Sequence, residues 1–131
     1  MKDDDPARAS QPEHTPLIAI VGPCASGKTT LASALRDQGY NARAIAQEHS
    51  NIRDLWQKFS HADVLVYLDV SLEGTRERRP AGRFDQERLA IQTKRLGHAR
   101  QHSDLYIHTD HLRREDVLDY VLAYLGDQQA S

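Results

Sequence analysis

The sequence predicts an α/β fold, a three-layer sandwich in which a parallel sheet of about four strands carries helices on both faces. Short apolar runs alternate along the chain with segments of helical periodicity, which is typical of strands joined by crossover helices. The first run, "LIAIV" at 17–21, holds no polar residue, as in a strand buried on both faces. The length of 131 residues fits one domain.

The elements follow one another in the order βαβαβααβα. We expect a flexible tail at 1–16, which holds three of the five prolines, a domain at 17–125, and a C-terminal tail at 126–131. The predicted strands are 17–21, 41–46, 64–70 and 105–108. The predicted helices are 28–37, 51–59, 71–79, 85–102 and 115–125.

Two helical segments carry specific signals. Ile52, Leu55, Trp56 and Phe59 follow the i, i+3, i+4, i+7 spacing of one helix face. This spacing predicts that Trp56 packs in the core, with stacking on a base as the alternative. Ser71 is suited to cap the helix that it begins.

Composition limits the partners and the location. The net charge is −2 at 39% hydrophobic residues, which gives no electrostatic reason to expect nucleic acid. A single cysteine excludes an internal disulfide, and no apolar run approaches the roughly 18 residues of a membrane span. The N-terminus is charged rather than signal-like, so we expect a cytoplasmic protein without a membrane partner.

The segment "GPCASGKTT" at 22–30 matches the G-x-x-x-x-G-K-[ST] pattern between a predicted strand and a predicted helix. In such a P-loop the backbone N–H groups and the positive helix end point at a phosphate. Lys28 would reach the β- and γ-phosphates as an exposed ligand, and the Thr29 hydroxyl would bind Mg²⁺. The residues expected to contact the nucleotide are Gly22, Cys24, Ala25, Ser26, Gly27, Lys28, Thr29 and Thr30.

Cys24 has two interpretations. It is either a small filler among the variable loop positions or a thiol activated by the helix N-terminus, whose oxidation would block nucleotide binding.

Two longer segments resemble known kinases. "ADVLVYLDVSLEGTRERRPAGRFDQE" at 62–87 is similar to the stretch of thymidylate and deoxynucleoside kinases in which a "YLDVS" strand leads to an arginine-rich lid. "SDLYIHTDHLRREDVLDYVLAYL" at 103–125 resembles the last strand and helix of this superfamily, which includes the shikimate kinases. The resemblance covers about 17–125 and implies ATP and Mg²⁺ as cofactors. It also implies that adenine lies between the lid and the loop at 108–113, and the chain lacks the guanine-selecting Asn-Lys-x-Asp.

The lid arginines can be assigned on physical grounds as well. Phosphoryl transfer spreads negative charge over the transferred group, and a closing cationic lid stabilises it. We expect Arg79 and Arg83 to be catalytic and Arg76 to contact the nucleotide, whereas Arg78 points elsewhere and is solvated. The alternative is that these arginines form an ordinary charged helix face.

Two acids compete for the remaining functional roles. Asp69 ends an apolar strand in the Walker B manner and is a candidate Mg²⁺ ligand. Glu48, after the second strand, is similar to the Glu of the "ERS" motif of deoxynucleoside kinases, which acts as a base, although His49 replaces the arginine of that motif. Glu48 is therefore a candidate base and a candidate metal partner beside Thr29.

His98 and His102 lie four apart on a predicted helix and could hold a metal ion, but no third ligand has a suitable spacing. We therefore expect surface histidines.

The chain is shorter than the kinases that it resembles, which usually have five strands and a helical insertion that grips the acceptor. We therefore expect a minimal kinase that transfers the γ-phosphate of ATP to an unidentified acceptor at an open site, framed by Glu48, His49, Ser50 and the lid. The alternative is a nucleotide-binding switch or slow NTPase that acts through a protein partner. A homodimer or such a partner is the candidate for covering the open site.

Overall fold

The computed structural model describes residues 16–58 and 61–130, without the side chains of 128–130. In chain order its elements are β1 (Leu17–Val21), α2 (Lys28–Asp37), β2 (Asn41–Ala44), the short 3₁₀ helix η2 (Gln47–His49), α3 (Leu55–Lys58), β3 (Val64–Asp69), α4 (Leu72–Arg78), α5 (Gln86–Arg95), α6 (Gly97–Gln101), β4 (Leu105–His108) and α7 (Arg114–Ala130). The expected tail at 1–16 lies almost entirely outside the described residues.

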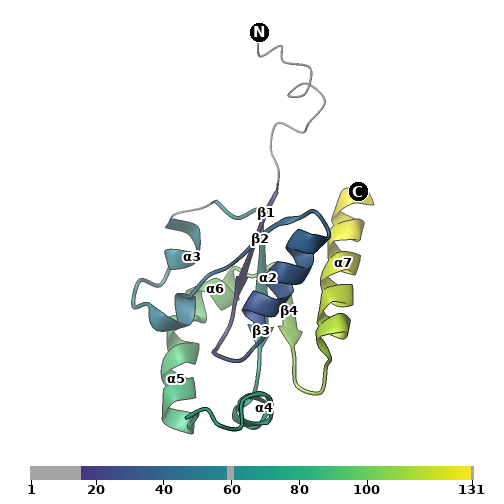
Figure 1. Cartoon of the computed structure of the whole chain (residues 1–131). Coiled ribbons are helices and arrows are strands. Elements are labelled where there is room, and N and C mark those ends of the chain that lie inside the picture. Colours follow the sequence, from purple (N-terminus) through teal and green to yellow (C-terminus); the bar gives the residue numbers. More distant parts are fainter. Residues whose placement is uncertain (1–15, 59–60, 131) are drawn as a thin grey trace.

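The four strands form one parallel sheet in the order β2-β1-β3-β4. β1 lies between β2 and β3, with Ile18 opposite Ala42 on one side and Val64 on the other. All five residues of β1 are buried, as the apolar run predicts. The predicted fold class, with about four parallel strands, is confirmed (Figure 1).

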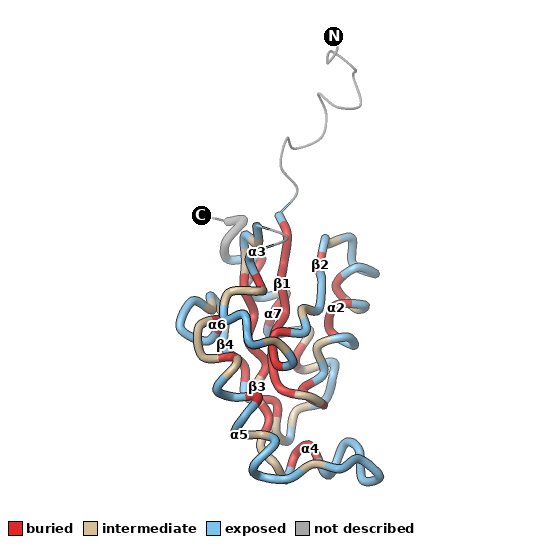
Figure 2. The backbone as a smooth tube through the Cα atoms, turned by 90° about the vertical axis from the view of Figure 1, so that its left-hand side faces the viewer, coloured by how far each residue is buried: buried red, intermediate tan, exposed pale blue. Residues whose placement is uncertain are grey.

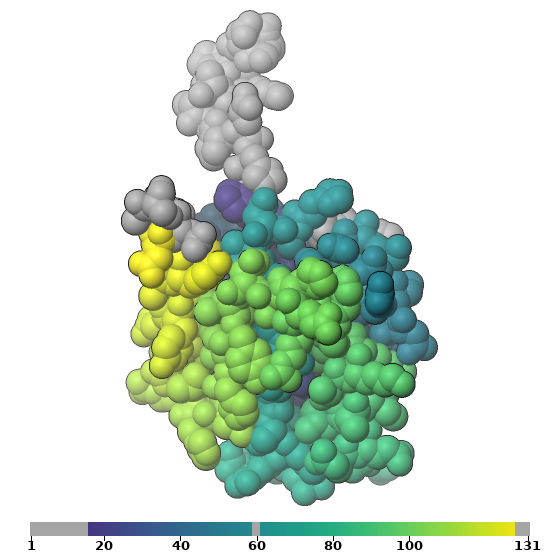
Figure 3. All heavy atoms as spheres, turned by 180° about the vertical axis from the view of Figure 1, so that it is seen from behind, coloured from purple at the N-terminus to yellow at the C-terminus, as the bar shows by residue number. Residues whose placement is uncertain are grey.

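Helices cover both faces of this sheet. On one face, α2 and α7 pack against alternate strand residues such as Ile20 and Leu68. On the other face, Trp56 of α3 and Leu96 and Ala99 at α6 pack against strand residues that include Tyr67. Seen from behind, the green segments of α5 and α6 cover much of the molecule, with yellow α7 at one side (Figure 3). The expectation that Trp56 packs in the core is confirmed, because this residue is 7% exposed.

The helix predicted at 51–59 is largely wrong. Only Leu55–Lys58 is helical, Ile52 is 47% exposed, and Phe59 lies outside the described residues. The buried side chain of Gln47 explains the difference, because its amide N–H donates to the Ile52 carbonyl at 2.7 Å and its amide oxygen accepts from the Trp56 N–H at 2.9 Å. These two bonds hold residues 51–54, just before α3, in an irregular turn.

Three other boundaries differ from the prediction. The strand expected at 41–46 ends at Ala44. The helix expected at 85–102 is divided at buried Leu96 into α5 and α6, and Gly97 begins the second. α7 continues to Ala130, so the expected tail at 126–131 is helical over most of its length.

The carboxyl ends of all four strands lie at one edge of the sheet, because the strands are parallel. The segments that follow them, including the P-loop after β1 and η2 after β2, therefore meet at that edge. In Figure 2 the buried backbone is concentrated in β1 and β3, and the chain beyond α4 at this edge is exposed.

Candidate functional site

The loop between β1 and α2 has the tight backbone that its glycines predict. A Cβ atom on Gly22 would overlap the carbonyl oxygen of Leu68, so only glycine allows β3 to approach so closely. Gly27 has φ 98° and Ala25 has φ 67°, both in the left-handed region. Gly27 is the N-cap of α2 and brings no capping side chain, so the first N–H groups of the helix remain available to a ligand.

Lys28 joins this loop to the turn after β2. Its ammonium group donates to the Gly22 carbonyl at 3.0 Å, to the Pro23 carbonyl at 3.3 Å and to Glu48 Oε2 at 2.7 Å. The lysine side chain is only 12% exposed, so the expectation of an exposed ligand is wrong. In this state Lys28 is one half of a largely buried ion pair.

Glu48 lies beside the loop, as expected. Its side chain is 4% exposed, and its second oxygen, Oε1, has no hydrogen-bond partner among the described residues. The Ser26 hydroxyl in the loop is buried and unpartnered in the same way. A buried polar atom without a partner is costly, so the site is arranged to accept a ligand or water at these two atoms.

Asp69 is held elsewhere. Its Oδ1 accepts from the Val70 N–H at 2.9 Å, and its Oδ2 accepts from the Tyr106 hydroxyl on β4. Burial, and then the hydrogen bond to Asp69, raise the pKa of Tyr106 to about 12. Both carboxylate oxygens of Asp69 therefore bond to groups outside the P-loop.

The arginine that contacts the P-loop is Arg78. Its guanidinium donates to the Ala25 carbonyl at 3.0 Å and to the Thr109 carbonyl at 2.7 Å, so it joins the loop to the end of β4. Arg78 is exposed as a residue, which agrees with the expected solvation, but the expectation that it points away from the loop is wrong. The sequence feature that could have indicated this contact is the spacing, because Arg78 lies three residues after buried Thr75 and so on the same side of α4.

The predicted lid arginines are exposed. Arg76 donates to the Phe84 carbonyl at 3.2 Å, and among the described residues neither the Arg79 nor the Arg83 side chain forms a hydrogen bond with the P-loop. Arg79 is the C-cap of α4, and the segment from it to Arg83 is exposed. Their part in a lid remains a prediction.

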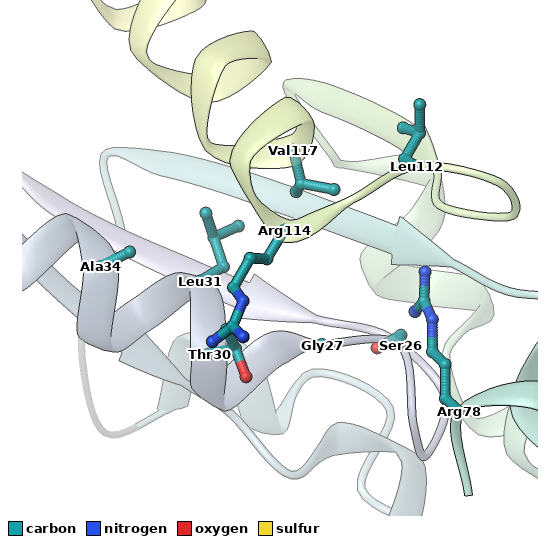
Figure 4. A pocket seen from close by; sticks show the side chains of 9 residues that line it. All are labelled: Ser26, Gly27, Thr30, Leu31, Ala34, Arg78, Leu112, Arg114 and Val117. Carbon is teal, nitrogen blue, oxygen red and sulfur yellow. The ribbon is translucent and has the colours of Figure 1, made fainter.

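A cavity of about 420 Å³ opens beside the loop, between the first turns of α2 and α7. It is lined by Ser26, Gly27, Thr30, Leu31, Ala34, Arg78, Leu112, Arg114 and Val117. Figure 4 shows Arg78 and Arg114 reaching into this space from different elements. The cavity therefore combines two cationic groups and loop polar groups with an apolar wall, and Leu112 belongs to the expected loop at 108–113.

A second residue that the sequence interpretation missed is Gln92 on α5. Its side chain is buried and holds Cys24 twice, because its oxygen accepts from the Cys24 N–H at 3.0 Å and its N–H donates to the Cys24 sulfur at 3.3 Å. The available signal was its place between Leu89 and Leu96, at the inward spacing of the helix.

The two histidines expected at the surface form a small aromatic cluster. The Trp56 indole N–H donates to His98 Nδ1 at 3.1 Å, and the His98 and His102 rings stack with centroids 4.3 Å apart. Among the described residues, three side chains with metal-ligating atoms come within 4.8 Å of one another only at Cys24, Glu48 and His49.

None of the helices in the described part of the chain is long and apolar enough to cross a bilayer. Comparison of the chain with protein-family models and with curated proteins finds no match.

Proposed function

We propose that this chain binds ATP·Mg²⁺ at residues 22–30 and transfers the γ-phosphoryl group to an acceptor that is still to be identified. The observation that carries the proposal is the P-loop itself, with Lys28 and Glu48 paired at 2.7 Å directly beside it. The sequence motif, its strand-loop-helix setting and the adjoining cationic cavity all support the same ligand chemistry.

In the proposed complex the phosphates lie against the N–H groups at the start of α2. Lys28 exchanges Glu48 for the β- and γ-phosphates, because a phosphate is the better partner for its charge. Mg²⁺, when bound, neutralises charge on the phosphates, and exposed Thr29 is the residue that would hold it. Asp69 is the weaker candidate ligand because both its oxygens already accept hydrogen bonds.

The nucleoside would occupy the cavity beyond the phosphates. Leu112 and Val117 offer apolar surface for a base, and the guanidinium of Arg78 can stack on it or contact the phosphates. The implied position of adenine near 108–113 agrees with this placement.

Glu48 becomes available as a base when Lys28 turns to the nucleotide. The proton of the acceptor hydroxyl passes to the Glu48 carboxylate, the acceptor oxygen bonds to the γ-phosphorus, and ADP leaves with the bridging oxygen. Arg79 and Arg83 would stabilise the transferred group if the exposed segment closes.

The alternative, a slow NTPase or switch, is favoured by one observation. His49, next to Glu48, has a side chain that is 54% exposed, so water can approach the acceptor side of the site. Water that competes with an acceptor would give hydrolysis in the absence of a covering partner.

Incubation of the purified chain with γ-labelled ATP and Mg²⁺ tests the proposal. The panel includes nucleosides, nucleotides, small metabolites and RNA ends. A labelled product identifies the acceptor, and labelled phosphate alone supports the NTPase. Absence of both, together with no ATP binding by calorimetry, would overturn the nucleotide assignment.

Two matched arginine variants separate the roles. Arg78→Met should weaken ATP binding at least tenfold, because it removes a cation from the cavity wall and its bond to the Ala25 carbonyl. Arg79→Met should leave ATP affinity unchanged and lower turnover, since a lid acts mainly on the transition state. Equal ATP affinity in both variants would contradict the place given to Arg78.

A further inference from the structure

Three side chains with metal-binding atoms meet beside the P-loop. Cys24 comes from the loop, and Glu48 and His49 come from η2, 24 and 25 residues further on. One ligating atom from each lies within 4.8 Å of the others. The nucleotide function proposed above leaves the thiol and the imidazole unassigned.

Two of the three distances between these atoms are close to those around a tetrahedral zinc ion. Cys24 Sγ lies 3.4 Å from His49 Nε2, and His49 Nε2 lies 3.6 Å from Glu48 Oε2. Ligands at the usual Zn–S and Zn–N bond lengths are separated by about 3.5 Å in a tetrahedron, and nitrogen and oxygen ligands by about 3.4 Å. These two distances each lie within about 0.2 Å of the tetrahedral values, and the ligating atoms of the third pair, Cys24 and Glu48, lie within 4.8 Å of each other.

The buried carboxylate supplies an independent indication of a ligand. Glu48 Oε1 is buried without a hydrogen-bond partner among the described residues, while Oε2 bonds to Lys28. The oxygen that faces His49 is Oε2, which is also the oxygen that bonds to Lys28, so a turn of the carboxyl group would let one oxygen bind a cation while the other keeps Lys28. Both oxygens would then have a partner, which removes the cost of the unpaired atom.

One helix, α5, fixes both halves of the cluster. Gln92 accepts a hydrogen bond from the Cys24 N–H and donates one to the Cys24 sulfur, so it orients this side chain as a supporting residue orients a metal ligand. One turn further on, Arg95 donates to the Glu48 carbonyl at 3.3 Å and to the Asn51 side chain at 3.1 Å. α5 therefore fixes the Cys24 side chain and the backbone of η2 that carries Glu48 and His49.

We propose that Cys24, Glu48 and His49 form a three-ligand site for a thiophilic divalent cation of the Zn²⁺ class, with a fourth position open to solvent. The mixed sulfur, nitrogen and oxygen donors favour such an ion over Mg²⁺, which prefers oxygen ligands. His49 is 54% exposed at its side chain, which provides the path of entry. Binding releases the thiol proton and needs no nucleotide, so the site can be tested apart from the proposed function.

The experiment titrates the reduced, tag-free chain with Co²⁺ and Zn²⁺ in the absence of nucleotide. Co²⁺ reports on its own ligands, because a bound thiolate gives a charge-transfer band in the near ultraviolet and a tetrahedral site gives intense visible bands. We expect both features at one Co²⁺ per chain, their loss on addition of Zn²⁺, and no effect of excess Mg²⁺. Absence of the charge-transfer band in the wild-type chain would overturn the site without recourse to any variant.

Variants then assign the ligands. Cys24→Ser should abolish the charge-transfer band, and His49→Asn should weaken Co²⁺ binding at least tenfold. Gln92→Leu should weaken binding about 10- to 100-fold, the usual effect of removing a group that supports a ligand. His102→Asn is the matched control and should change nothing, because this exposed histidine lies outside the cluster. An unchanged charge-transfer band in Cys24→Ser, or equal losses in His102→Asn and His49→Asn, would contradict the assignment.

Discussion

Replacement of Lys28 by methionine tests the ion pair beside the P-loop. The substitution keeps the length of the side chain but removes its charge, so Glu48 stays buried without a cationic partner at 2.7 Å. The side chains are 12% and 4% exposed, so Glu48 is buried and Lys28 is mostly shielded from water. Removal of one partner from such a pair costs about 3–5 kcal/mol.

Because Lys28 keeps some exposure to water, the free energy of unfolding should fall by an amount near the lower end of this range, at about 3 kcal/mol. For a domain of this size 1 kcal/mol corresponds to about 4 °C, so the melting temperature should fall by about 12 °C. Glu48→Gln should cost less, because Lys28 keeps the carbonyls of Gly22 and Pro23 and gains an amide oxygen.

Thermal and urea unfolding of both variants, followed by circular dichroism, give the measurement. Lys58→Met is the matched control. Its ammonium lies 3.9 Å from Asp54 at 49% exposure, and such a surface pair contributes about 0.5 kcal/mol or less. A loss in Lys28→Met no larger than that in Lys58→Met would refute the claim that the P-loop lysine is a buried, structural cation in the absence of nucleotide.

Three further predictions concern stability. Gly22→Ala should lower the free energy of unfolding by well over 1 kcal/mol in urea titrations, because its Cβ would overlap the backbone of β3. Gly126→Ala is the control, because Gly126 faces open space on α7, and this change should raise the free energy of unfolding by about 0.5–1 kcal/mol. A destabilised Gly126→Ala would contradict this reasoning. Ser71→Ala should cost about 1 kcal/mol, because the serine hydroxyl accepts from the Gly74 N–H at the start of α4; unchanged urea unfolding would contradict it. Burial, and then the charge of His102, lower the pKa of His98, so its neutral form stabilises the fold above the ordinary pKa near 6.5 and that contribution is lost as the pH falls below it. His98→Asn, which keeps an acceptor for the Trp56 indole, should therefore show a smaller fall in melting temperature between pH 7.5 and pH 5.5 than the wild type; equal falls would contradict this.

The sequence was informative where one local rule determines the structure. The unbroken apolar run of β1 and the alternation of strands with helices predicted the parallel sheet, and the glycine pattern predicted the loop. Ser71 caps α4 as expected, with its hydroxyl 3.0 Å from the Gly74 N–H. These features depend on residues that are close in the chain.

Prediction failed where a distant polar side chain determines the outcome. Helical spacing at 51–59 was overridden by two hydrogen bonds from Gln47, and spacing alone contains no information on them. Arg78 was expected to point away from the loop because its bonding partners, the carbonyls of Ala25 and Thr109, lie 53 and 31 residues away. The burial of Lys28 likewise depends on a partner 20 residues further along.

The contact between Cys24 and Gln92 also sets an order of events during synthesis. The two residues are 68 positions apart, and a ribosome adds about 5–20 residues per second, so about 3–14 s separate their addition to the chain. For most of that interval the complete glycine motif has been made, yet α5, which fixes Cys24 and the Glu48 backbone, does not exist. A nascent chain or a fragment that ends before α5 therefore carries the glycine motif without the hydrogen bonds that fix Cys24 and the turn after β2.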